Sequence, residues 1–143
     1  MNFKKQIDDI VEHIKDNFSK YTTAKYQVTK EFLDFDKYKQ DFTIFVDFKR
    51  LKFETNRWTD DCRDVEELSA SIYLVVRNDK SENLNEKILD YSSAFYKYLR
   101  KEKPDFLSRL TINQLNFYNY VEGNKYLMAS EFDLSLLIEE DDE

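Results

Sequence analysis

The chain has 143 residues and a mass of 17.4 kDa, the size of one ordinary domain with one core. It holds 12 Phe, 10 Tyr and 1 Trp but only one each of Gly, Pro, Cys and His, which excludes a glycine-rich phosphate loop, a zinc cage of His and Cys, and an internal disulfide. The formal net charge is −7, and most of it comes from an acidic tail: Glu139, Glu140, Asp141, Asp142 and Glu143.

Residues 1–138 are therefore expected to form one nearly neutral domain, followed by the acidic tail at 139–143. No uninterrupted apolar run approaches the roughly 18 residues of a membrane span. The opening stretch MNFKKQIDD turns acidic at once, so a secretory signal is not expected either. A lone cysteine agrees with a reducing compartment inside a cell.

The first predicted element is an amphipathic helix over residues 3–21, because apolar side chains recur there at spacings of three and four. These side chains are Phe3, Ile7, Ile10, Val11, Ile14, Phe18 and Tyr21. Alternation that starts at Tyr26 and Val28 and continues weakly toward Phe35 predicts a first strand.

Two strongly alternating stretches predict an antiparallel pair of strands at 42–53 and 66–78. Phe42, Ile44, Val46 and Phe48 are expected on the buried face of the first, with Phe45 as the exception to its pattern. The polar connection at 54–64 is longer than a tight hairpin needs and is expected to project from the domain.

A second helix is predicted up to about Lys101, before Pro104, and Asn83 precedes Glu86 at the spacing of a capping box. Strand-like runs at 110–121 and 126–138 flank Gly123 and predict a hairpin. The fold class is then α+β, a mostly antiparallel sheet covered by two main helices in the order α-β-β-β-α-β-β.

Residues that could carry chemistry are few, and none is expected to be catalytic, to bind a cofactor or to hold a metal. His13 lies off the apolar centre of its helix, where an exposed imidazole is expected. Cys62 stands among Asp60, Asp61 and Asp64, whose charges disfavour a thiolate, and these acids lack the register of a calcium loop.

One stretch is clearly basic, and its members are Lys97, Arg100, Lys101, Lys103 and Arg109. Cations at the end of a helix are stabilised by its dipole, which explains the stretch without any partner. A subunit contact or a nucleic-acid contact is the alternative, but without a broad basic surface no sequence-specific nucleic-acid binding is expected.

Six residues are candidates for a protein interface. Trp58, with Arg57 and Arg63 in the polar loop, belongs to the residue types that dominate interfaces, although Trp58 could instead fold back onto the end of the sheet. Tyr73, Tyr118 and Tyr120 are expected either at the edge of the core or on a contact surface.

The chain resembles the tail-terminator and head-tail joining (minor tail) proteins of long-tailed bacteriophages and prophages. The resemblance lies in the element order, the opening helix, the strand pair, the helix KILDYSSAFYKYLRK and the stretch INQLNFYNYVEGNKYLMASEFDLSLLIEE. It spans most of the chain and includes no diagnostic motif.

The resemblance implies a non-enzymatic assembly protein whose copies form a ring, commonly a hexamer, that caps the tail tube and contacts head-connector proteins. It implies residence in the host cytoplasm during assembly and then in the virion tail, with no cofactor and no membrane. The projecting loop would reach a neighbouring subunit or the tube end, and the acidic tail would keep DNA from adhering to the channel.

Two other classes of protein remain open from the sequence. A monomeric acidic binding or inhibitor protein that masks a basic partner would gather acids on one folded face. An enzyme that acts through carboxylates and tyrosines, for instance on a sugar, would need paired acids in a pocket.

Overall fold

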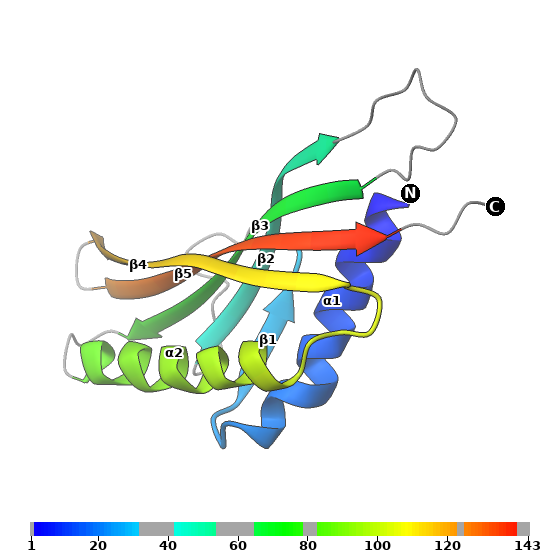
Figure 1. Cartoon of the computed structure of the whole chain (residues 1–143). Helices are drawn as coiled ribbons and strands as arrows, with labels where there is room; N and C mark the ends of the chain where they lie inside the picture. Colours follow the sequence, from blue (N-terminus) through cyan, green and yellow to red (C-terminus); the bar gives the residue numbers. More distant parts are fainter. Residues whose placement is uncertain (1, 32–41, 54–64, 79–82, 123–124, 140–143) are drawn as a thin grey trace, which may run out of the picture.

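The computed structural model describes residues 2–31, 42–53, 65–78, 83–122 and 125–139. The predicted order α-β-β-β-α-β-β is confirmed (Figure 1). The elements are α1 (Phe3–Asn17), a 3-10 turn η1 (Phe18–Lys20), β1 (Tyr26–Thr29), β2 (Phe42–Phe53), β3 (Val65–Asn78), α2 (Leu84–Lys101), β4 (Arg109–Glu122) and β5 (Lys125–Glu139).

The five strands form one sheet in the order β1-β2-β3-β5-β4. The predicted antiparallel pairing of β2 with β3 is confirmed, as is the β4–β5 hairpin, and β5 also pairs antiparallel with β3. Only β1 runs parallel to its neighbour, β2. The predicted continuation of the first strand toward Phe35 and the loop at 54–64 lie outside the described residues.

Both helices pack on the same face of the sheet, and one core joins them to it. The alternation predicted for β2 and β3 is confirmed, because Phe42, Ile44 and Val46 are buried and face this core together with Ile72 and Leu74. Phe45, the exception in the sequence pattern, lies on the other face, where it stacks on Tyr73 with ring centroids 5.8 Å apart.

The aromatic residues concentrate where the two helices meet the sheet. Phe18, which is fully buried, lies with its ring centroid 5.1 Å from Tyr26, 6.0 Å from Phe42 and 5.1 Å from Phe95. Edge-to-face and tilted pairs at these distances stabilise beyond the area that they bury. These rings fill the part of the core where α1, α2 and β2 meet, and most of the other buried hydrophobic side chains are aliphatic.

The two helices begin in different ways. The side chain of Asn2 caps α1 by accepting a hydrogen bond of 3.0 Å from the backbone N–H of Lys5. Asn83 precedes α2 as predicted, but it makes no side-chain cap hydrogen bond, so the capping-box prediction is wrong. Its backbone is left-handed, with φ 67°, a conformation that asparagine tolerates better than most residues.

Candidate functional site

The face of the sheet opposite the helices, here called the open face, carries the most connected polar cluster in the described structure. In the part of the chain that the structure describes, no helix packs on this face. Strand register places Glu131 of β5 directly between Tyr73 of β3 and Asn116 of β4. Ser71 and Tyr118 come from the next positions on the same face, two residues along their strands.

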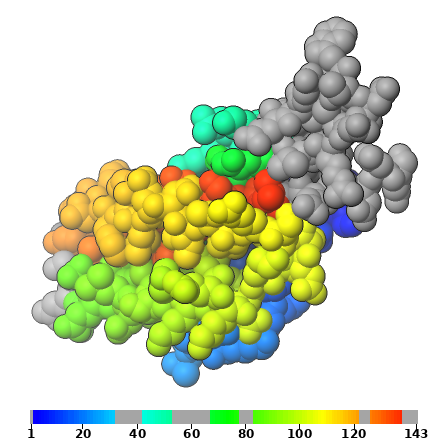
Figure 2. Space-filling view, viewed as in Figure 1, coloured from blue at the N-terminus to red at the C-terminus, as the bar shows by residue number. Residues whose placement is uncertain are grey.

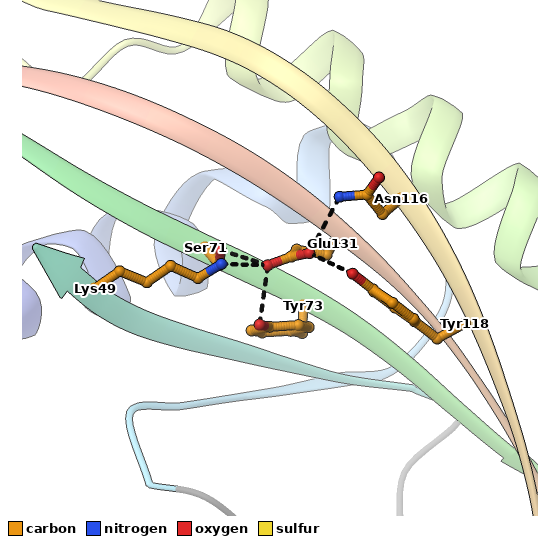
Figure 3. A network of polar contacts seen from close by, with 6 residues as sticks. All are labelled: Lys49, Ser71, Tyr73, Asn116, Tyr118 and Glu131. Atoms are coloured by element: carbon orange, nitrogen blue, oxygen red, sulfur yellow. Dashed lines mark hydrogen bonds and ion pairs between the residues drawn. The ribbon is translucent and has the colours of Figure 1, made fainter.

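The carboxylate of Glu131 accepts five hydrogen bonds from side chains on three other strands (Figure 3). Its Oε2 accepts from Lys49 Nζ at 2.7 Å, from Ser71 Oγ at 2.7 Å and from Tyr73 OH at 2.9 Å. Its Oε1 accepts from Tyr118 OH at 2.8 Å and from Asn116 Nδ2 at 3.2 Å. Both oxygens are therefore fully engaged.

Lys49 reaches Glu131 from β2, across the whole width of β3 (Figure 3). The path crosses β3 beside Ser71, whose short side chain leaves room for the lysine stem. A bulge between Phe48 and Arg50 interrupts the β2–β3 register at Lys49. The ion pair is asymmetric, since the Lys49 side chain is 41% exposed whereas that of Glu131 is 5% exposed.

Burial raises the pKa of Glu131, but its hydrogen bonds, that from Lys49 foremost, lower it more and bring the pKa to about 2. The hydrogen bond to Glu131 raises the pKa of Lys49. Burial and the same carboxylate raise the pKa of Tyr73, and the hydrogen bond to Glu131 raises that of Tyr118. The cluster holds one fixed negative charge, one fixed positive charge and neutral phenols at neutral pH.

This arrangement suits cross-strand attachment better than proton transfer. A general acid or base works best with a pKa near the operating pH, and the pKa of Glu131 lies far below it. Both of its oxygens already accept protein donors, so a substrate would have to displace them. Glu131 therefore links β5 to strands β2, β3 and β4.

The structure brings two of the six predicted interface residues together and leaves a third close by. Tyr73 and Tyr118 share the Glu131 carboxylate, and Tyr118 remains 49% exposed. Tyr120 follows on the same strand and is 52% exposed. Arg57, Trp58 and Arg63 lie outside the described residues.

Sequence reasoning missed Glu131 and Lys49, the two charged members of the cluster. In an alternating strand, a charged residue at an outward position is most simply interpreted as solvent-exposed. Lys49 and Glu131 both occupy such outward positions in alternating stretches. The signal that identifies them is strand register, which opposes Glu131 to Tyr73 and Asn116. Register is not encoded locally in any one strand.

His13 corrects a second expectation, since it is not an exposed imidazole. Its Nδ1 lies 2.5 Å from the hydroxyl of Tyr98, and its ring is half-buried where α1 meets α2. Burial lowers the pKa of His13, although Glu102, Asp105 and Asp16 act in the opposite direction. Nearby, Tyr21 donates a hydrogen bond of 3.0 Å to Glu102.

In the basic stretch, the side chains of Arg100 and Lys103 make hydrogen bonds within the chain. Arg100 Nη1 donates to Tyr96 OH at 2.8 Å, and its guanidinium lies 5.6 Å from the centre of that ring. Lys103 Nζ donates to the carbonyl of Leu107 at 2.5 Å. Arg100 and Lys101 occupy the last turn of α2, as the helix-dipole explanation requires.

The described residues contain no group of three or more His, Cys, Asp or Glu side chains arranged to hold a metal ion. Among the helices that the structure describes, none is long and apolar enough to cross a membrane.

No protein-family model matches the chain, and no curated protein matches its sequence significantly.

Proposed function

We propose that the chain is a non-enzymatic assembly protein of a phage or prophage particle, a tail-terminator or head-tail joining subunit that forms a ring at the end of the tail tube. Its partners would be further copies of itself, the tail-tube protein and the head connector. The proposal keeps the localisation that the resemblance implies, first the host cytoplasm and then the virion tail.

The observation that carries the proposal is where exposed apolar side chains gather. In the described structure, every exposed large hydrophobic residue except Phe3 lies on α2 or β4: Leu89, Tyr96, Phe117, Tyr118, Tyr120 and Val121. These two elements lie beside each other on one face of the molecule (Figure 2). Tyr118 lies on the open face and Phe117 on the helix side, so the exposed side chains of β4 line both sides of this edge. Exposed apolar side chains that gather at one edge of a sheet mark protein contacts more often than chemistry.

The site favours contact over catalysis for a second reason. The most connected polar cluster, around Glu131, has its carboxylate saturated by donors from the chain itself. Its low pKa gives it no proton to transfer near neutral pH. The α+β arrangement, with both helices on one side of a mostly antiparallel sheet, also agrees with the fold that the resemblance implies.

The described residues do not favour an acidic inhibitor. Such a protein needs a face of one charge sign, whereas the open face mixes Asp47 and Asp133 with Lys49, Arg50 and Lys52.

The test is a deletion of the gene in a strain that produces the particle. We expect separate heads and tails without a cap, seen by negative-stain electron microscopy, with joining restored by the gene supplied in trans. Antibody labelling of complete particles should then mark the head-proximal end of the tail. Normal joined particles made without this chain would contradict the proposal.

A further inference from the structure

The two outer edges of the sheet differ in how far they are exposed to pairing. At one edge, β1 pairs with only the first four positions of β2, Phe42 to Phe45. Among the strands that the structure describes, none pairs with the outer side of β2 from Val46 to Phe53. At the other edge lies β4, which pairs with β5 on its inner side.

The free part of β2 has the features by which natural sheets prevent edge pairing. Asp47, Lys49, Arg50 and Lys52 are charged, and the bulge between Phe48 and Arg50 interrupts the strand. Charged side chains, especially lysine, and bulges make a poor template for a second strand. This edge is protected against association.

The β4 edge lacks this protection. No charged residue occurs from Leu110 to Val121, although 36% of the chain is charged. Its bulge, between Ile112 and Gln114, precedes the exposed aromatic part of the strand. Phe117 is 49% exposed and Val121 is 58% exposed. A long, uncharged and partly apolar edge is a template for another strand.

The helix beside the β4 edge also carries exposed apolar side chains. The helix α2 packs mainly on β3 and β5 and lies beside β4 (Figure 2). Leu89 and Tyr96 are exposed apolar residues of this helix. A partner strand at the β4 edge would therefore meet a continuation of apolar surface on the helix side of the sheet.

We propose that β4 pairs antiparallel with β4 of a second copy of this chain, so that two sheets join across a two-fold axis. In such a pair every side chain lies opposite a residue of the same strand, and any charge near the axis would oppose its own copy. The uncharged run from Leu110 to Val121 satisfies this requirement, whereas the charged edge of β2 does not. From the bulge at Asn113 onward the uncharged stretch runs to Val121, and Phe117, its midpoint, is expected nearest the axis.

This pairing does not rest on the proposed function and goes beyond it. A two-fold contact cannot by itself close a larger ring. The pairing therefore describes the free protein, and the two copies would have to separate before the exposed side chains of α2 and β4 could serve a ring contact.

The experiment measures the mass of the purified full chain by light scattering and sedimentation over a wide concentration range. The wild-type chain should approach twice 17.4 kDa as concentration rises. Phe117→Lys and Phe117→Glu should each weaken self-association by about tenfold or more, since like charges then meet at the axis and a ring contact is lost. An equal mixture of the two variants should regain the dimer mass, because opposite charges then face each other.

Two controls isolate the contact. Phe117→Asn removes the ring without a charge and should weaken pairing less than either charged variant. Arg50→Glu changes a charge on the protected β2 edge and should leave self-association unchanged. Thermal melts followed by circular dichroism establish that each variant is folded.

Hydrogen exchange of the wild-type chain gives a second readout that needs no substitution. Protection of the β4 amides should rise with protein concentration. A monomeric wild-type chain at every concentration would overturn the proposal, as would a dimer that survives both charged variants or that Arg50→Glu abolishes.

Discussion

At the scale of single residues, Glu131 has the largest effect on the open face. One carboxylate receives donors from β2, β3 and β4, so four strands share one anchoring group. Removal of a buried charge that is hydrogen-bonded leaves its partners unsatisfied, which costs more than the pair contributes when intact. Lys49 keeps partial access to water and lessens that cost.

Replacement of Glu131 by Gln should lower the free energy of unfolding at neutral pH by about 2 to 3 kcal/mol. The folded-state pKa, about 2, lies below the ordinary value of 4.5, so the stabilisation is complete above pH 4.5 and is lost as the pH falls toward 2. Urea unfolding at several pH values measures this. The wild-type and variant curves should converge in acid, and Asp133→Asn, on the same strand and face, should change stability much less. Parallel curves would contradict the assignment.

The pKa of His13 offers a second test, because the chain holds one imidazole and its NMR signals need no further assignment. Burial lowers the pKa, so titration of the folded protein should give a midpoint below 6.5, and titration in denaturant should return it toward 6.5. Because the folded pKa is lowered, this group should reduce stability as the pH falls below 6.5. A folded midpoint at or above 6.5 would show that the acids nearby, Glu102 first, outweigh burial.

At the scale of elements, a buried polar contact joins α2 to the sheet within a largely apolar interface. Ser92 of α2 and Ser130 of β5 are 3% and 0% exposed, and their hydroxyl oxygens lie 2.7 Å apart. Each hydroxyl satisfies the other where water does not reach. A buried hydroxyl without a partner costs about 1 to 3 kcal/mol, whereas removal of both can be nearly neutral.

Ser92→Ala and Ser130→Ala should therefore each lower the free energy of unfolding by about 1 to 2 kcal/mol. The double variant should lose less than either single variant, because it leaves no unpaired hydroxyl. A double-mutant cycle by chemical denaturation measures the coupling. Additive losses would mean that the two hydroxyls do not depend on each other.

The sequence predicts individual helices and strands better than it predicts the contacts between them. The strand at 42–53 was predicted with its bounds, since alternating large side chains fix a half-buried strand locally. The Glu131 cluster was not predicted, because Lys49 and Glu131 are far apart in the chain and meet only through the order β2-β3-β5. The position of β5 between β3 and β4, and the parallel pairing of β1, also depend on long-range contacts that no local pattern contains.

At the scale of the whole molecule, Phe18 joins the N-terminal segment to the rest of the fold. Its ring meets Phe42 of β2 and both Phe95 and Tyr98 of α2. Loss of this ring opens a cavity where three elements converge, and large-to-small changes of this kind are costly because the site cannot collapse fully.

Phe18→Ala should lower the free energy of unfolding by about 3 to 5 kcal/mol. Phe3→Ala is the matched control, since Phe3 is 51% exposed on the preceding helix and its loss should cost little. Urea denaturation followed by circular dichroism compares the two variants. Equal losses would place Phe3 and Phe18 in equivalent surroundings, contrary to the structure.

The sheet order also constrains when the protein can fold during synthesis. Of the strands that the structure describes, β5 is synthesised last, yet it occupies an interior position and is a partner of both β3 and β4. Until then the nascent chain can form helices and the β2–β3 pair, but β4 remains without its only described neighbour. Completion of the sheet therefore follows the synthesis of β5, and a chain shortened within β5 would leave β4 without its described partner and one side of β3 unpaired.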